Sequence, residues 1–177
     1  MRFLLSSLAV MLCAACSGYH VGPVKPTKFK NVHRICVKNF KNDTLEPRME
    51  SLLANAVIKQ FHVDGTYEIT GEANADAILQ GTVTQIQRTP TRALRGNILQ
   101  STEYLLILHA SYRLTDAHGG QLLDARSVTG TTSFFVASGS TDQDLLTADT
   151  AQDERQAIPL AAEDLATRIT SLISEGW

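Results

Sequence analysis

The fold of this 177-residue chain is decided by the stretch YLLILHASYRL, Tyr104 to Leu114. Every even-numbered side chain in it is apolar, without a miss. The odd-numbered side chains begin apolar and become polar from His109 onward. This period of two is typical of a β-strand that buries one face. We therefore predict a long strand over residues 99–116 whose even-numbered side chains lie in the core.

Two further long strands flank this stretch, over residues 75–89 and 121–132. The glycine pair Gly119-Gly120 lies between the second and third strands and predicts a hairpin turn. In the first strand the apolar alternation slips near Thr84-Gln85, which predicts a β-bulge. Residues 90–97 are expected to form a loop. The three strands therefore form an antiparallel meander.

Shorter elements precede the meander. Residues 32–40 and 67–70 predict strands, and 41–43 predict a turn. Between them, apolar residues at three-and-four spacing predict a helix that runs to about residue 62. Thr44 is its expected N-cap, with Glu46 and Pro47 in the first turn.

A second helix closes the chain. Residues 133–148 are rich in Ser, Thr, Asp and Gly and predict a loop. The helix is expected to begin near Asp149 or Asp153, and its apolar stripe runs almost to the C-terminus. Pro159 is expected to kink this helix or to mark the first turn of its main segment.

The order strand, helix, strands, helix leads to one fold class. Each helix has a single apolar stripe and the sheet has one matching apolar face. We predict an α+β fold, a two-layer sandwich with two helices packed on one face of a four- to five-stranded, mostly antiparallel sheet. Residues 32–177 are expected to form one domain.

The N-terminus predicts export and lipidation. Arg2 precedes an apolar run, Phe3 to Leu12, which is followed by Cys13-Ala14-Ala15-Cys16. This pattern is typical of a secretory signal peptide, residues 1–15, that resembles a bacterial lipobox. Acyl chains on Cys16 would hold the chain on a membrane through residues 16–31, an extended tether. The alternative is an ordinary cleaved signal peptide with a structural cysteine nearby.

The residue after the acylated cysteine predicts the membrane to which the lipoprotein is sorted. Ser17 lacks the aspartate that favours inner-membrane retention, so the expected location is the outer membrane, periplasmic face. Anchoring by lipid fits the rest of the chain, because no other apolar run approaches the length of a spanning helix.

Composition limits the function classes. The formal net charge is −2, so nucleic acid is an unexpected partner. Cys36 has no expected disulfide partner, and its apolar neighbours predict a small buried role. The five histidines show no metal-binding spacing. With no G-x-S-x-G elbow either, we expect no metal, no cofactor and no catalytic residue.

The order of several short motifs resembles the LptE family of lipopolysaccharide-assembly lipoproteins. They are Cys16 to His20, Ile35 to Pro47, Ala75 to Gly81, Ala161 to Ala166 and Glu175 to Trp177. The resemblance covers essentially the whole chain after the signal peptide. It implies a non-enzymatic lipoprotein that sits inside an outer-membrane β-barrel, LptD, plugs it and helps it fold. It also implies lipopolysaccharide as a ligand that the pair inserts into the outer leaflet.

Three arginines are the candidate ligand contacts. Arg88, Arg92 and Arg95 lie on or beside the expected loop 90–97, at three-to-four spacing. A guanidinium group can bind a phosphate through two parallel hydrogen bonds. The alternatives are a solvated basic loop or one that contacts acidic residues of the barrel.

Two other functions remain open on sequence grounds. One is a lipoprotein that binds or activates a peptidoglycan synthase or another envelope complex. The other is a lipid-anchored hydrolase, for which the sequence offers no recognisable nucleophile and base. Co-purification with a barrel or with a peptidoglycan enzyme distinguishes the first two readings.

Overall fold

The computed structural model describes residues 25–94, 97–135 and 143–176. Two α-helices, six strands and two short 3₁₀ helices account for most of them. In chain order they are η2 (Thr27–Phe29), β1 (Arg34–Val37), β2 (Lys41–Asn42), α2 (Met49–Asp64), β3 (Glu68–Ile69), η3 (Glu72–Asn74), β4 (Ala77–Leu94), β5 (Asn97–Asp116), β6 (Leu122–Phe135) and α3 (Gln143–Glu175).

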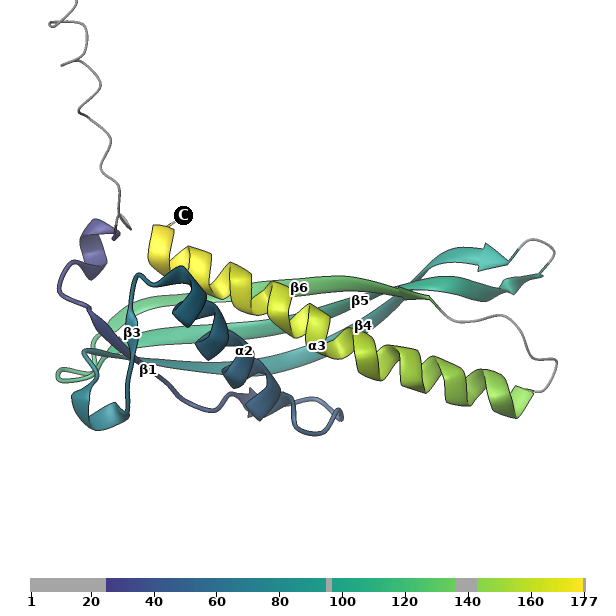
Figure 1. The fold of residues 1–177 in the computed structure, drawn as a ribbon, viewed down its shortest axis with the longest axis horizontal. Coiled ribbons are helices and arrows are strands. Elements are labelled where there is room, and N and C mark those ends of the chain that lie inside the picture. Colours follow the sequence, from purple (N-terminus) through teal and green to yellow (C-terminus); the bar gives the residue numbers. More distant parts are fainter. Residues whose placement is uncertain (1–24, 95–96, 136–142, 177) are drawn as a thin grey trace, which may run out of the picture.

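The strands form one mixed sheet in the order β3-β1-β4-β5-β6, with β2 also paired to β4. The long strands β4, β5 and β6 form the predicted antiparallel meander. The short strands pair in parallel, and β2 uses residues that the sequence predicted as a turn. Both helices lie against the same face of the sheet (Figure 1). The predicted α+β sandwich is confirmed, with two of its strands only two residues long.

The core lies between this face and the helices. The predicted even-numbered side chains of β5 are buried there from Leu106 to Leu114, whereas Tyr104 is partly buried. Leu106, Leu108 and Leu114 are at most 1% exposed. From α3, Leu165 and Ile169 meet them and are 0% exposed. Burying one such side chain stabilises the fold by roughly 1.5–3 kcal/mol.

Strand β4 is longer than the sequence predicts. The predicted bulge is confirmed, since the register with β5 shifts between Val83 and Gln85. The predicted loop 90–97 is wrong over 90–94, because β4 continues to Leu94 and Pro90 lies opposite Tyr104. Proline lacks the N–H that a regular ladder needs, and further register shifts beyond Pro90 accommodate it.

Helix α2 begins later than predicted, at Met49 rather than at Thr44. The side chain of Asn42 binds groups of Thr44 and Glu46, and these bonds hold the segment out of the helix. Its Oδ1 accepts hydrogen bonds from the Thr44 N–H at 3.0 Å and hydroxyl at 2.7 Å, and its Nδ2 donates to the Glu46 carbonyl at 2.8 Å. Such local side-chain bonds favour a turn over a helix. Arg48, in the left-handed region with φ of 65°, then starts the helix.

Helix α3 begins earlier than predicted, at Gln143, and β6 continues to Phe135. The predicted loop 133–148 is therefore wrong at both ends, and residues 136–142 lie outside the described residues. Pro159 lies inside α3. Because proline has no N–H, the carbonyl of Arg155, four residues earlier, has no donor at that position of the helix.

Asp76 fastens the start of β1 to the start of β4. Its Oδ2 accepts hydrogen bonds from the backbone N–H groups of His33, at 3.0 Å, and Arg34, at 2.9 Å. Its Oδ1 pairs with the Arg34 guanidinium at 3.0 Å. Burial alone would raise the pKa of Asp76, but these bonds outweigh it and lower the pKa to about 2. The Ala75-Asp76-Ala77 motif thus has a structural role.

Candidate functional site

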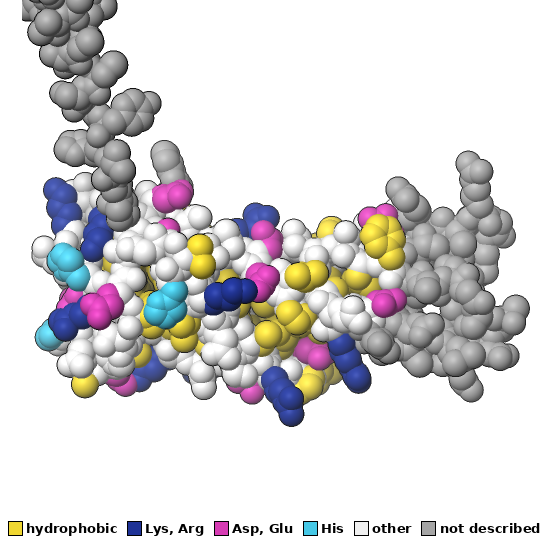
Figure 2. All heavy atoms as spheres, in the orientation of Figure 1, with side chains coloured by type: hydrophobic (Ala, Val, Ile, Leu, Met, Phe, Trp, Pro, Cys, Tyr) yellow, Lys and Arg dark blue, Asp and Glu magenta, His cyan; other side chains and the backbone are white. Residues whose placement is uncertain are grey.

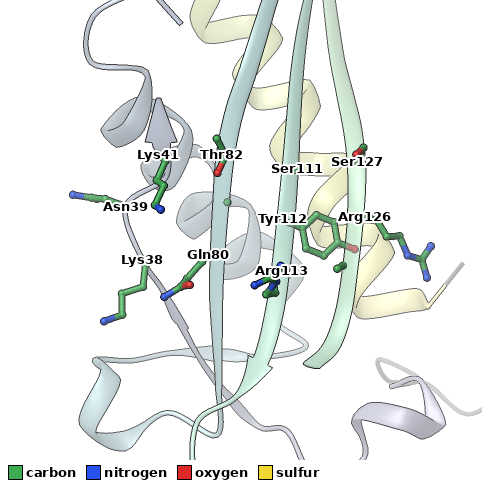
Figure 3. A pocket seen from close by; sticks show the side chains of 12 residues that line it. Lys38, Asn39, Lys41, Gln80, Thr82, Ser111, Tyr112, Arg113, Arg126 and Ser127 are labelled. Carbon is green, nitrogen blue, oxygen red and sulfur yellow. The ribbon is translucent and has the colours of Figure 1, made fainter. Parts of the chain in front are cut away.

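The face of the sheet that the helices leave uncovered carries a basic hollow of about 950 Å³ (Figure 3). Strands β4, β5 and β6 and the segment between β1 and β2 contribute to it. Its charged lining consists of four cations and no carboxylate. Three of these cations lie on the uncovered face, and we call them the basic sheet face: Lys38, Lys41 and Arg113. Arg126 borders the hollow from the helix side, because it lies opposite the buried Tyr112.

Strand register explains this grouping. Arg113 lies opposite Gln80, and Ser111 lies opposite Thr82, in the β4–β5 pair. Lys41 of β2 lies beside Thr82 from the other side. Since successive side chains of a strand point to opposite faces, burying Tyr112 and Leu114 places Arg113 on the uncovered face.

In the part of the chain that the structure describes, two of the four cations that line the hollow have no acidic partner. Lys38 pairs with Glu72, and Arg126 pairs with Asp124 at 3.2 Å. Among the described residues, neither Lys41 nor Arg113 has a salt bridge. The hollow is therefore positively charged, and its guanidinium, ammonium and hydroxyl groups can donate to phosphate or carboxylate oxygens.

Asp124 holds the β5–β6 edge of the sheet together on the helix side, since it lies opposite Leu114. Its carboxylate accepts a hydrogen bond from the Tyr112 hydroxyl at 2.7 Å and contacts Lys28 Nζ at 3.2 Å, besides Arg126. Burial opposes ionisation of Asp124, but the bonds from Tyr112 and Lys28 outweigh it and lower its pKa. The pKa of Tyr112 is raised, mainly by burial and to a smaller extent by the hydrogen bond to Asp124. The network also ties η2, which contains Lys28, to β6.

Of the three predicted arginines, the structure describes the side chain of Arg88 alone, and Arg88 lies away from the basic sheet face. Arg88 belongs to β4 and lies opposite Leu106, so it faces the helices. Its Nε donates to Glu154 Oε1 of α3 at 2.6 Å, and Nη2 contacts the same oxygen. This bond raises the pKa of Arg88 further above its usual value, against the opposing effect of burial. The side chain of Arg92, and Arg95 entirely, lie outside the described residues, as does Cys16.

Comparison with known families decides the identity of the domain. The family model described as "LptE: Lipopolysaccharide-assembly" matches residues 32–173, most of the chain. The chain belongs to the LptE family. The resemblance seen in the short motifs is thereby confirmed, and the chain is a lipopolysaccharide-assembly protein of the bacterial envelope. No sequence among curated proteins matches the chain.

Solved structures share this LptE-family fold at low sequence identity. The PelC dodecamer from Paraburkholderia phytofirmans is 13% identical, with a TM-score of 0.53 over 87% of this chain and 96% of that chain. A minor lipoprotein from Acinetobacter baumannii is 18% identical, with a TM-score of 0.52 over 82% and 92%. The uncharacterised lipoprotein B from Nitrosomonas europaea is 13% identical, with a TM-score of 0.51 over 90% and 94%. These likenesses concern the fold.

In the ranges that the structure describes, no three His, Cys, Asp or Glu residues gather as metal ligands. Cys36 is free and buried, in agreement with its predicted role. No helix of the described residues has the length and apolar character needed to cross a membrane.

Sequence reasoning missed the basic sheet face. Lys38 and Lys41 lie far from Arg113 in the chain, and only the register of the strands brings them together. One signal was available: the odd-numbered side chains of the Tyr104–Leu114 stretch become polar and end in Arg113.

Proposed function

We propose that this LptE-family protein is anchored by acyl chains on Cys16 at the periplasmic face of the outer membrane. In this proposal residues 1–15 are cleaved and the tether is the part of residues 16–31 that precedes η2. The expected tether is too long at its end, because Phe29 of η2 is 1% exposed in the core. The domain associates with an LptD-type β-barrel, plugs its lumen, and assists the transport and insertion of lipopolysaccharide. The family match over residues 32–173 supports this role.

The observation that carries the proposal is the basic sheet face. A domain that plugs a barrel needs a surface that can meet a polar wall or a charged ligand. The hollow offers two cations that have no acidic partner among the described residues, Lys41 and Arg113, beside the hydroxyl groups of Thr82 and Ser111. Lipopolysaccharide carries phosphates, which are natural partners of such a group. The role is one of binding rather than catalysis.

Affinity purification of the full-length protein from solubilised outer membranes tests the partner. We expect a large β-barrel subunit to be retained in detergent. Mass spectrometry of the N-terminal peptide should find Cys16 acylated. A peptidoglycan enzyme in place of a barrel, or no membrane partner at all, would contradict the proposal.

Binding of purified lipopolysaccharide tests the ligand. Charge-assisted hydrogen bonds contribute about 1.5–3 kcal/mol each, so K41Q/R113Q should weaken binding about tenfold or more. The triple variant R88A/R92A/R95A tests the arginine cluster in the same assay. Lys59→Gln is the control, since Lys59 lies on α2 and pairs with Glu163 on the helix side. Unchanged affinity in both multiple variants would remove direct ligand binding from the proposal.

A further inference from the structure

The sheet has one long free edge. Strand β6 contains 14 residues and is the last strand in the sheet order, so among the described residues it pairs with β5 alone. The opposite edge strand, β3, is protected by its shortness, since it contains only two residues. Residues 127–135 of β6 contain neither proline nor a charged side chain, the features that commonly keep an edge strand from pairing. The edge of β6 is therefore suited to the addition of another strand.

One contact shows which backbone groups of β6 point outward. The N–H of Thr131 donates to Asp164 Oδ2 of α3 at 2.8 Å, so it is turned away from β5. A residue of an antiparallel strand directs its N–H and C=O to the same side, and this side alternates along the strand. The register with β5 is regular over residues 124–135. Four more residues therefore direct their backbone groups outward, and among the described residues these groups have no hydrogen-bond partner: Ala125, Ser127, Thr129 and Ser133.

The spacing of these backbone groups identifies the chemical class of the partner. An N–H donor and a C=O acceptor recur together at every second residue, roughly 7 Å apart along the strand. A lipid headgroup or a sugar can bond to one such pair of groups. Only an extended polypeptide backbone offers the complementary acceptors and donors at the same repeat. The edge of β6 thus fits another β-strand.

The position of α3 is incompatible with a second copy of this chain as the partner. Helix α3 packs mainly over β6, and at Gly130 it comes so close that a Cβ would lie 2.3 Å from the Ala161 carbonyl oxygen. Paired strands lie about 4.8 Å apart, whereas packed helices need about 8–10 Å. Joining the β6 edges of two copies about a twofold axis would force their α3 helices closer than helices can pack. Pairing of β6 with β3 of another copy would engage only two residues of β3.

The flank of α3 beside this edge offers a side-chain contact. Leu160, Asp164 and Arg168 lie on one flank of the helix, at intervals of four residues. Because Asp164 reaches Thr131, this flank lies beside the free edge of β6. Leu160 is 55% exposed there, and Figure 2 shows hydrophobic side chains at the surface over the middle of α3. An added strand would therefore place an apolar side chain of its helix-side face on Leu160.

We propose that the free edge of β6 binds an extended segment of a partner protein by β-strand addition. The outward backbone groups of Ala125, Ser127 and Thr129 pair with the backbone of the segment. The pairing lacks one bond at Thr131, whose N–H stays with Asp164. The segment belongs to a part of its protein that carries no helix on this side. This site goes beyond the proposed function, because it uses backbone groups of β6 rather than the cations of the basic sheet face.

Photocrosslinking from both sides of the edge tests the proposal. The full-length protein in intact cells carries p-benzoylphenylalanine in place of Leu160, on the helix side, or of Ser133, which is exposed on the uncovered face. Since the side chains of a strand alternate between faces, both positions should link to one segment of another protein, at residues an odd number of positions apart. The position control is Val63, which is 72% exposed on α2 and should give no adduct with this segment.

Removal of one outward N–H supplies the second arm. Thr129→Pro deletes that donor but leaves the hydrogen bonds between β5 and β6, so it should reduce both adducts about tenfold. Thr129→Ala keeps the N–H and is the matched control, for which no change is expected. Urea unfolding checks that T129P is folded, and if it is not, the spacing of the two linked residues decides.

Several outcomes would overturn the proposal. They are an adduct with lipid or with a second copy, links to two different segments, an even spacing, no adduct, and adducts that persist in folded T129P. Acylation of Cys16 and retention of the β-barrel by the wild-type protein are scored separately. Failure of strand addition is therefore distinguishable from failure of the proposed function.

Discussion

The two faces of β5 differ although they share one backbone. On the helix side, Leu106, Leu108 and Leu114 are almost completely inaccessible. On the other side Arg113 is exposed and helps to line the basic hollow. The alternation of the strand thus separates two roles, since one face holds the helices and the other is available for recognition.

This separation teaches that stability and binding can be probed independently in this domain. Substitutions on the covered face remove packing against α2 and α3. Substitutions on the uncovered face change charge without disturbing that packing. The following predictions test the contrast, beginning with the largest effect on the free energy of unfolding.

Leu108→Ala should cause the largest loss. Leu108 is 1% exposed, and removing its buried methyl groups leaves a cavity that costs about 2–5 kcal/mol of stability. Its neighbour Ile107 lies on the uncovered face and is only partly buried. Ile107→Ala is therefore the matched control and should cost less. Urea unfolding followed by circular dichroism measures both, and equal losses would break the contrast between the faces.

Gly130→Ala tests the closest approach of α3 to the sheet. A Cβ built at Gly130 of β6 would lie 2.3 Å from the Ala161 carbonyl oxygen and 2.4 Å from Leu165 Cβ. Helix or strand must shift, which typically costs about 1–3 kcal/mol. Gly71→Ala is the control, because nothing lies within 4 Å of its Cβ position and its φ is −73°. A neutral Gly130→Ala would show that α3 packs more loosely on β6.

Asp76→Asn tests the fastening of β1 to β4. The variant loses the charge that the Arg34 pair and two backbone N–H groups stabilise, so a loss of about 1–2 kcal/mol is expected at neutral pH.

The same carboxylate predicts a pH dependence. Its pKa falls from 3.8 to about 2 on folding, so its contribution is fully present above about pH 4. That contribution is lost as the pH falls from 4 toward 2. The difference in unfolding free energy between wild type and Asp76→Asn should shrink over this window. A constant difference would contradict the role assigned to Asp76.

Much of the fold could be predicted because its signals are local. Alternation along residues 104–114 and the phase slip near Thr84 indicate the covered face directly, and the glycine pair at 119–120 indicates the turn between β5 and β6. The boundaries were harder, because they depend on groups that compete for the same backbone. Asn42 holds Thr44 in a turn, which delays α2, and irregular pairing lets β4 pass through Pro90.

The candidate site could be predicted only in part. Sequence spacing grouped Arg88 with Arg92 and Arg95, but the bulge in β4 turns Arg88 toward α3 and Glu154. The basic sheet face joins residues from three segments, namely the stretch between β1 and β2, strand β2 and strand β5, and no local sequence pattern predicts this grouping. Family membership indicates the role in lipopolysaccharide assembly, whereas the register of the sheet reveals the basic sheet face.

The smallest effect on stability is expected for K41Q/R113Q on the uncovered face. Both side chains are exposed and neither has a salt bridge among the described residues, so the free energy of unfolding should change by less than about 0.5 kcal/mol. The same variant is expected to weaken lipopolysaccharide binding. Urea unfolding and a binding titration on one preparation measure both quantities. A large loss of stability would mean that the uncovered face also supports the fold, and the division between the two faces of β5 would fail.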